Sequence, residues 1–207
     1  MSQAAVALAL YAVYMVTAFG VRSVLQRRRT GSTGFHGISG SPGSAEWVGG
    51  VLFVCALLLG AVAPAAQLAG VVAPLAVLDS SGVARAGTIL AVAGIVLTLV
   101  AQHAMGRSWR IGVDASEVTE LVTTGPFAIV RNPVFAAMLP TGLGLALIAP
   151  NAVALAAVGV LLLALETQTR VVEEPYLLAS HGQRYAEYAA RVGRFAPGVG
   201  RLDPYRS

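Results

Sequence analysis

The fold is decided by residues 134–168, VFAAMLPTGLGLALIAPNAVALAAVGVLLLALETQ. Two apolar segments, 134–149 and 151–168, meet at Ala149-Pro150-Asn151, a sequence that favours a tight turn. Each segment is close to the ~20 residues that a helix needs to cross a bilayer. We therefore predict an antiparallel pair of membrane-spanning helices, the first of which is short and either tilted or kinked at Pro140.

Three further apolar segments precede this pair, at residues 4–21, 47–66 and 83–105, and each has the length of a transmembrane helix. Residues 67–78 are apolar too, but glycine and proline interrupt them, so we expect an irregular or interfacial connection there. The sequence therefore predicts an all-α polytopic membrane protein with about five transmembrane helices.

The composition argues against a soluble chain. Of the 207 residues, 56% are hydrophobic and 12% are charged, whereas a soluble domain carries about 25% charged residues. All 14 basic residues are arginines, scattered without interleaved aromatic residues, so we expect no nucleic-acid partner. The single cysteine, Cys55, lies in an apolar run and the three histidines are far apart in sequence, so we expect neither a disulfide nor a metal site.

The arginines also predict the orientation in the membrane. With five spans and the N-terminus outside, every arginine except Arg85 falls on the inner side, and most acidic residues fall there too. The first span lacks a preceding basic segment and is followed by Arg22, which is typical of a retained anchor rather than a cleaved signal. We expect an integral protein of a bacterial plasma membrane, in contact with its lipids, with the C-terminus and any active site cytoplasmic.

The chain is expected to form one membrane domain with two parts. Residues 1–105 hold three spans and a Gly/Ser-rich cytoplasmic loop at 30–46, which is either a flexible connection or a lid over a ligand. Residues 106–207 hold the helical pair 134–168 and a cytoplasmic tail.

The tail carries an apolar stripe with the period of a helix, formed by Leu178, Tyr185, Tyr188, Val192 and Phe195. This spacing predicts a cytoplasmic amphipathic helix. The helix either lies on the inner leaflet or closes a cytoplasmic pocket.

Two polar regions stand out from the rest of the chain, and the first is residues 121–135, LVTTGPFAIVRNPVF. Pro133 suits the first turn of the helix that follows, where its missing N–H costs nothing. The free N–H groups at that helix end favour an anionic ligand group. The alternative is a simple interfacial anchor, with Arg131 on a lipid phosphate.

The second polar region is residues 170–188, RVVEEPYLLASHGQRYAEY. Two adjacent carboxylates, Glu173 and Glu174, are costly just below a span unless they bind a cationic ligand or stay solvated. A solvated acidic cap balanced by Arg170 is the alternative. Glu166, near the end of the last span, is expected to face a polar cavity or to reach the lipid headgroups.

Taken together, the two regions resemble the isoprenylcysteine carboxyl methyltransferase family of integral membrane enzymes. The family pattern is LVTxGPYxxxRHPxY, then an apolar hairpin, then EExxLxxxxGxxYxxY, and the resemblance covers about residues 102–197. This sequence has Asn132 in place of the usual histidine, and Phe127 and Phe135 in place of tyrosines. Pro175 after the acid pair is also unusual and is expected to bend or restart the helix.

The resemblance implies methyl transfer from S-adenosylmethionine, leaving S-adenosylhomocysteine, in a cytoplasmic pocket that a lipophilic acceptor enters from the bilayer. Such an acceptor is an isoprenylcysteine-like carboxylate or another small lipophilic acid, thiol or amine. The candidate cofactor contacts implied by the resemblance are Glu120, Leu121, Val122, Phe127, Asn132, Pro133, Val134, Phe135, Glu173, Glu174, Tyr185 and Tyr188. Its candidate catalytic residues are Asn132, Arg170, which would address the acceptor's carboxylate, and Glu173.

Two other interpretations stay open. Residues 105–114, MGRSWRIGVD, resemble a stretch shared with sterol-type membrane reductases that use NADPH, and the same fold also suits a non-catalytic membrane protein. Within the hairpin, Gly142 and Gly144 either pack helices closely or lie against the cofactor, as a similar pair does in related membrane methyltransferases.

Overall fold

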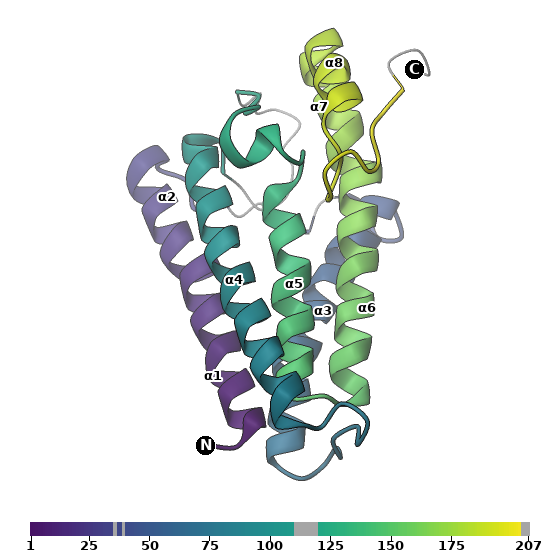
Figure 1. Cartoon of the computed structure of the whole chain (residues 1–207). Helices are drawn as coiled ribbons and strands as arrows, with labels where there is room; N and C mark the ends of the chain where they lie inside the picture. The colour runs from purple at the N-terminus through teal and green to yellow at the C-terminus, as the bar shows by residue number, and fades with distance from the viewer. Residues whose placement is uncertain (35–36, 39, 110–119, 204–207) are drawn as a thin grey trace.

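The computed structural model describes residues 1–34, 37–38, 40–109 and 120–203. In this part of the chain the regular structure is helical, without strands, and long helices lie side by side in alternating directions (Figure 1). Four are long and apolar enough to cross a membrane, namely Gln3–Thr30, Ala45–Leu68, Ser81–Met105 and Ala152–His181, and a shorter apolar helix, Pro133–Ile148, lies among them. The predicted polytopic helical membrane fold is confirmed.

The first continuous helical segment is longer than the span that the sequence predicted at residues 4–21. It runs through α1 (Gln3–Met15), a π-helical segment η1 (Val16–Val21) and α2 (Arg22–Thr30). The helix continues because no residue breaks it before Gly31, whose φ of 84° is a left-handed conformation that suits glycine at a helix end. Three arginines in the last turn of α2, at positions 27–29, face the negative end of the helix dipole.

Serine caps begin the next two helices. The side chain of Ser44 accepts a hydrogen bond from the N–H of Trp47 at the start of α3 (Ala45–Leu68). Ser80 does the same for Val83 at the start of α4 (Ser81–Met105). The connection between the two helices contains turns and irregular backbone, as the sequence predicted.

The hairpin forms as predicted. Helix α5 (Pro133–Ile148) begins at its proline and continues past Pro140, and α6 (Ala152–Thr167) returns beside it. Asn151 is fully buried at the turn. Its Oδ1 accepts from the N–H of Ala154, and its Nδ2 donates to the carbonyl of Ala63 on α3. This one side chain therefore caps α6 and ties the turn to a third helix.

Glycines allow α4 and α5 to pack at backbone distance. A Cβ added at Gly144 would lie 2.4 Å from the backbone nitrogen of Ala91, and one at Gly87 would lie 2.7 Å from the carbonyl oxygen of Gly144. Gly142 faces the opposite helix, where an added Cβ would meet Leu161 at 3.3 Å. Close helix packing therefore accounts for Gly144.

The last continuous helical segment extends beyond the apolar span, and the chain that follows it folds over the end of the bundle. Helix α6 passes into a π-helical segment, η4 (Gln168–Glu173), and into α7 (Glu174–His181), which begins at the acid pair and Pro175. The chain breaks at Gly182, with φ of 51°, before α8 (Gln183–Arg191). Helix α8 is the predicted amphipathic helix of the tail, but it carries only part of the apolar stripe, because Gly182 separates Leu178 from Tyr185 and Tyr188, and Val192 and Phe195 follow the end of α8.

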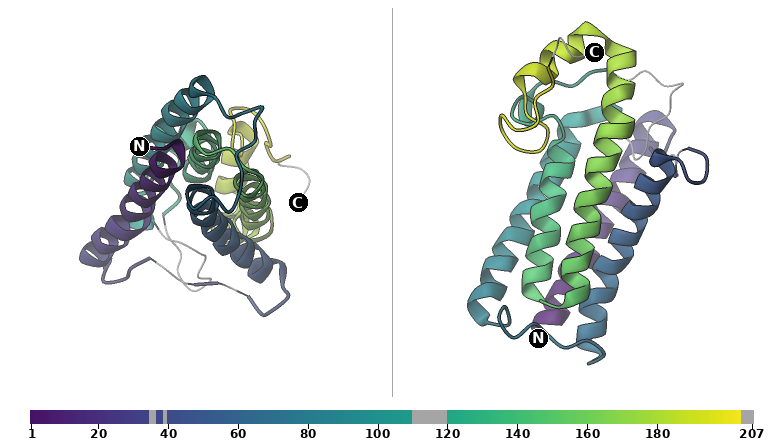
Figure 2. Two further views of the ribbon diagram at one scale, coloured as in Figure 1. Left: turned by 90° about the horizontal axis from the view of Figure 1, so that it is seen from below. Right: turned by 90° about the vertical axis from the view of Figure 1, so that its right-hand side faces the viewer.

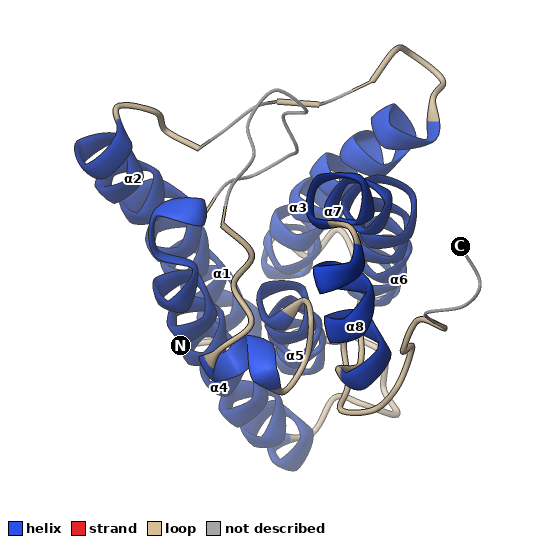
Figure 3. Ribbon diagram, turned by 90° about the horizontal axis from the view of Figure 1, so that it is seen from above, coloured by secondary structure: helices blue, strands red, loops and turns tan. Residues whose placement is uncertain are grey.

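Both polar regions lie at one end of the bundle, together with the end of α2 and the described parts of residues 31–44 (Figures 1 and 3). The N-terminus, the connection between α3 and α4, and the α5–α6 turn lie at the opposite end (Figure 2). Among the described residues, the fold thus gathers most of the charged side chains at one end of the bundle, as the arginine pattern predicted.

Candidate functional site

A polar cavity of about 750 Å³ lies at the polar end of the bundle. The residues that line it are Met105, Ser108, Glu120, Leu121, Val122, Phe127, Arg131, Asn132, Glu173, Tyr176, Leu177, Tyr185 and Tyr188. The fold therefore brings together, in one cavity, parts of the two sequence regions that the family resemblance singled out.

Eight of the residues implied as cofactor contacts lie in this wall. They are Glu120, Leu121, Val122, Phe127, Asn132, Glu173, Tyr185 and Tyr188. Among the described residues, the wall also includes Tyr176 and Leu177, which the sequence did not single out. Both residues belong to α7, the helix that begins at the acid pair. Their position just after that pair was the sequence signal that could have identified them.

A buried hydrogen bond joins the two halves of the wall. The hydroxyl of Tyr188, on α8, donates to the carbonyl of Phe127 at 2.6 Å. Phe127 belongs to a short 3-10 turn, η3 (Gly125–Ala128), that begins at the Gly-Pro of the first region. Burial raises the pKa of Tyr188 to about 12, so its hydroxyl remains a donor at neutral pH.

Arg131 and Glu174 form the centre of a buried ionic cluster, which also contains Arg194. Arg131 Nη2 lies 2.5 Å from Glu174 Oε1, and Arg194 donates to both carboxylate oxygens of Glu174 at 2.9 Å. Hydrogen bonding to Glu174 raises the pKa of Arg194, so this guanidinium stays charged. Glu174 does not line the polar cavity, and its position shows a structural pairing in place of the ligand contact implied by the resemblance.

Arg131 also holds the C-terminal segment against the bundle. Its Nη1 donates to the carbonyls of Ala189 and Val192, and its Nη2 donates to the carbonyl of Gly200. Its backbone N–H donates to Gly193. Because the side chain is buried and both of its Nη atoms are engaged in these contacts, the interfacial anchor on a lipid phosphate is not the role that this structure gives Arg131.

Asn132 and Pro133 sit where α5 begins. Pro133 is buried in the first turn, as predicted, and the side chain of Asn132 makes no cap bond to the helix. The backbone N–H of Asn132 donates to the carbonyl of Arg194 at 3.1 Å. Asn132 therefore reaches the wall of the polar cavity at the positive end of the helix dipole.

A second cavity, the outer apolar cavity, lies beside the polar one and has a volume of about 1,060 Å³. Val134 and Phe135 line this cavity and not the polar one. Glu173 lines both. It belongs to the π-helical segment η4, a type of irregularity that is frequent at functional sites. Glu173 thus marks the place where a polar space and an apolar space meet.

The Gly/Ser-rich loop contributes to the outer apolar cavity. Gly37 and Ile38 line it, and Ile38 packs so closely on α3 that a Cβ added at Gly50 would lie 2.7 Å from its Cγ2. On the other side Trp109, which is buried, also lines the cavity, and the guanidinium of Arg22 lies 4.8 Å from the centre of its ring. The described part of the loop therefore covers an apolar space.

Arg170 lies apart from these cavities. Its side chain is 59% exposed and pairs with Glu166 one helical turn earlier. Glu166 lines neither cavity and is also 4.0 Å from Arg194. The described charged residues of the outer apolar cavity are Glu46 and Glu173, both acidic.

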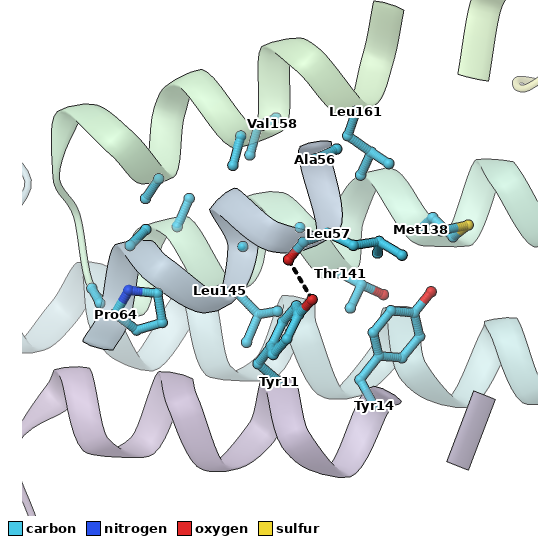
Figure 4. Close-up of a pocket in the computed structure, with 17 residues that line it drawn as sticks. Tyr11, Tyr14, Ala56, Leu57, Pro64, Met138, Thr141, Leu145, Val158 and Leu161 are labelled. Atoms are coloured by element: carbon cyan, nitrogen blue, oxygen red, sulfur yellow. Dashed lines mark hydrogen bonds between the residues drawn. The ribbon is translucent and has the colours of Figure 1, made fainter. Parts of the chain in front are cut away.

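A third cavity, the inner apolar cavity, lies deeper between α1, α3, α5 and α6 and has a volume of about 600 Å³ (Figure 4). Tyr14, Leu57 and Met138 line both it and the outer apolar cavity. Among the described residues, no three His, Cys, Asp or Glu side chains gather in a way that could hold a metal ion. Residues 110–114, half of the reductase-like stretch, lie outside the described part of the chain.

The comparisons with known proteins bear on this geometry. Residues 83–184, about half of the chain, match the phospholipid methyltransferase family. The predicted family resemblance is confirmed. The matched region includes the hairpin, the whole of residues 121–135 and most of residues 170–188.

Two individual proteins are similar to this chain. The nickel-cobalt-cadmium resistance protein NccN of Alcaligenes xylosoxydans xylosoxydans is 31% identical over 109 residues, covering 52% of this chain and 49% of NccN. The chain thus aligns with about half the length of that curated relative. The structure of the eukaryotic intramembrane Ras methyltransferase ICMT matches with a TM-score of 0.62 and 20% identity, over 94% of this chain and 66% of that one. This second likeness concerns the fold.

Proposed function

We propose that this protein transfers the methyl group of S-adenosylmethionine to a lipophilic acceptor at the polar end of the bundle. The observation that carries the proposal is the position of Glu173 in the wall shared by the polar cavity and the outer apolar cavity. A methyl transfer between a polar donor and a lipophilic acceptor needs two such spaces in contact. The family match supports the same reaction class.

The residues of the polar cavity fit the proposed donor. Glu120 and Glu173 supply carboxylates for its ammonium group and ribose hydroxyls, and Phe127 and Tyr176 supply aromatic rings for its adenine. The start of α5, next to Asn132, has the positive dipole that suits the donor's carboxylate. Each part of the donor thus has a suitable group among the lining residues.

When bound, S-adenosylmethionine supplies an activated methyl group on a sulfonium. The chain's own contribution is to orient the two reactants and to keep water out, which is where most of the rate of such a displacement arises. Tyr188 fixes the η3 turn over the cavity by its bond to Phe127. The wall also includes aromatic and aliphatic side chains, which limit the access of water.

The outer apolar cavity is the proposed site of the acceptor's reacting group. Its described lining contains two carboxylates, Glu46 and Glu173, together with the amides of Gln102 and Gln168, and no Arg, Lys or His. Arg170, which the family resemblance implied as the partner of an acceptor carboxylate, is exposed and paired with Glu166. This charge pattern favours an acceptor with a donating or cationic group, such as a lipophilic thiol or amine, over a lipophilic acid.

A calorimetric titration tests the donor. Purified protein in lipid nanodiscs is titrated with S-adenosylhomocysteine and, separately, with NADPH. We expect S-adenosylhomocysteine to bind, Glu173→Gln to weaken that binding at least tenfold, and Glu46→Gln to leave it within twofold. Glu46 is the matched control because it lines only the outer apolar cavity. Binding of NADPH alone would favour the reductase, and binding of neither ligand would favour a non-catalytic protein.

Mass spectrometry tests the acceptor. Membrane lipid extracts are incubated with the protein and methyl-labelled S-adenosylmethionine, and the labelled products are fragmented. We expect the label on sulfur or nitrogen of a lipophilic molecule. A labelled ester as the sole product would show that the proposed acceptor class is wrong.

We also propose that the polar end faces the cytoplasm, as the arginine pattern predicts. Cysteines introduced at Arg85 and at Arg184 mark opposite ends of the bundle, in a background that lacks Cys55. In intact cells, a membrane-impermeant maleimide should label the first position and spare the second. The reverse labelling would invert the topology.

A further inference from the structure

The methyl transfer proposed above requires the acceptor to lose a proton. The bond between the methyl carbon and the donor's sulfur breaks, and its electron pair stays on the sulfur of S-adenosylhomocysteine. The new bond uses a lone pair of the acceptor's sulfur or nitrogen. A thiol or an ammonium group must therefore release one proton for each methyl group that it receives, and a base placed beside it raises the rate by about 10²–10⁴-fold.

The outer apolar cavity offers few groups that could take this proton. Among the described residues that line it, the titratable side chains are Glu46 of α3, Glu173 of η4 and Tyr14 of α1. The amides of Gln102 and Gln168 lie there too, but an amide is not a base. Glu173 also lines the polar cavity, where the ammonium group of the proposed donor needs a counter-charge. Tyr14 is a phenol, which holds its own proton at neutral pH. Glu46 is the carboxylate that remains for the acceptor.

Helix packing places Glu46 on the side of the cavity where the donor is proposed to bind. Glu46 is in the first turn of α3 and shares a face with Gly49, three residues later. A Cβ added at Gly49 would lie 3.3 Å from Cγ2 of Thr167 and 3.7 Å from Oε1 of Gln168. Because Gln168 begins the same π-helical segment that contains Glu173, the face of α3 that carries Glu46 packs against the segment shared by both cavities.

The Gly/Ser-rich loop covers the carboxylate of Glu46. A Cβ added at Gly40 would lie 3.0 Å from Oε2 of Glu46, and Gly40 has a φ of 83°, so glycine suits this position for both space and conformation. The ion pairs of the described residues join other acids, so no described arginine neutralises Glu46. The residue is half-buried, which leaves it a contact with solvent as well as with the cavity.

We infer that Glu46 is a catalytic residue that accepts the proton of the acceptor's thiol or ammonium group. With a thiol, the S–H bond breaks, the proton bonds to a carboxylate oxygen of Glu46, and the sulfur lone pair attacks the methyl carbon. With an ammonium group, the proton moves to Glu46 first and the freed nitrogen lone pair then attacks. The proton leaves Glu46 for water at the solvent side. This inference rests on the proposed methyl transfer, and Glu46 lies outside residues 83–184, which carry the family match.

The first test compares acceptors that carry a proton with one that does not. At about pH 7.5, octanethiol and octylamine are protonated, whereas 4-butylthiophenol is largely a thiolate. Rates are measured in nanodiscs with methyl-labelled S-adenosylmethionine. Glu46→Gln should lower kcat/KM about 100-fold for the first two acceptors and less than about threefold for 4-butylthiophenol, and Glu46→Asp should recover part of the loss. Glu166→Gln is the control because Glu166 lines neither cavity, and it should stay within about twofold for all three.

The second test measures binding without any reaction. The protein is saturated with S-adenosylhomocysteine, and affinity for octylamine and for 4-butylthiophenol is measured from the rise in Tm. Glu46→Gln removes a negative charge, so it should weaken binding of the ammonium cation about fivefold and leave binding of the thiolate equal or stronger. Opposite effects on the two ligands cannot arise from a general loss of folding, which would weaken both.

The outcomes separate this inference from the proposed function. If the wild-type chain does not bind S-adenosylhomocysteine, the proposed function itself is wrong. If it binds S-adenosylhomocysteine but methylates none of the three acceptors, the acceptor class is wrong and the inference with it, while the donor stands. If Glu46→Gln leaves the rate with octanethiol unchanged, or lowers the rates with the two thiols equally, Glu46 does not take the proton and only the inference is overturned.

Discussion

Arg131 Nη2 lies 2.5 Å from Glu174 Oε1, and the two side chains are 1% and 7% exposed. This pair joins the loop before α5 to the first turn of α7, and Arg194 adds two bonds from the C-terminal segment. Removing one partner of a buried ion pair leaves an uncompensated charge, which costs far more than losing an exposed pair.

Glu174→Gln is therefore expected to destabilise the protein by about 3–5 kcal/mol. The reason is that two buried guanidinium groups lose their counter-charge. Thermal unfolding in nanodiscs measures the loss, and saturating S-adenosylhomocysteine should recover only part of it. The neighbouring Glu173→Gln should show the opposite pattern, with a small change in Tm and a large change in ligand affinity. If the Glu174→Gln protein is as stable as the wild type but no longer binds S-adenosylhomocysteine, Glu174 contacts the cofactor and the structural interpretation is wrong.

Tyr188→Phe tests the bond that closes the polar cavity. The substitution leaves the carbonyl of Phe127 without its buried donor, and we expect a loss of about 1–3 kcal/mol in the free energy of unfolding. The η3 turn should become less ordered, so affinity for S-adenosylhomocysteine should fall as well. Hydrogen exchange of residues 125–128 measures the loosening directly. If exchange there stays at the wild-type rate, the bond does not hold the turn.

High pH should weaken the same contact. The pKa of Tyr188 is about 12 in the folded protein and 10.0 for an ordinary tyrosine, and burial is the main cause. A raised pKa means that the folded state keeps the proton longer, so the stabilisation is complete below pH 10 and is lost as the pH rises towards 12. Tyr185 is shifted in the same direction. Unfolding curves between pH 9 and 12 should show this decline, and Tyr188→Phe should reduce its slope.

Gly144→Val tests the packing of α4 on α5. A Cβ at residue 144 would lie 2.4 Å from the backbone nitrogen of Ala91, so the helices would have to separate. We expect destabilisation of about 3 kcal/mol or more, at the upper end of overpacking effects. Gly159→Ala is the control, because an added Cβ there meets nothing within 4 Å, and it should be neutral or stabilising by up to about 1 kcal/mol. Equal Tm values for the two variants would contradict the packing.

Arg170→Ala should have a small effect. Its partner Glu166 is on the same helix and its side chain is mostly in solvent, so the pair is worth about 0–1 kcal/mol. We expect the Tm and the affinity for S-adenosylhomocysteine to change little, and the KM for a thiol or amine acceptor to stay within about twofold of the wild type. A large rise in that KM would place Arg170 in contact with the acceptor.

Much of the fold could be predicted because it follows from local patterns. Apolar length located the membrane helices, and Ala149-Pro150-Asn151 located the hairpin turn. The position of Pro133 at the first turn of α5 followed from its chemistry alone. The length of the first continuous helical segment was underestimated, since polar residues continue a helix readily when nothing breaks it before Gly31.

The site was harder to predict from the sequence, because the residues that make its key contacts are far apart along the chain. Arg131 and Arg194 lie on either side of Glu174, 43 and 20 residues away, and no periodic pattern links them. Adjacent position therefore suggested the same role for Glu173 and Glu174, although one faces the cavities and the other faces the arginines.

The contacts of Arg131 with Val192, Gly193 and Gly200 have a consequence for biogenesis. The apolar helices are long and hydrophobic enough to enter the bilayer as each one emerges from the ribosome. The wall of the polar cavity gains its brace only after residue 200 has been synthesised and has folded back over α5. Assembly of this protein is therefore expected to have two stages, insertion and then closure, and a nascent chain stalled between them would be embedded in the membrane without the brace of its polar cavity.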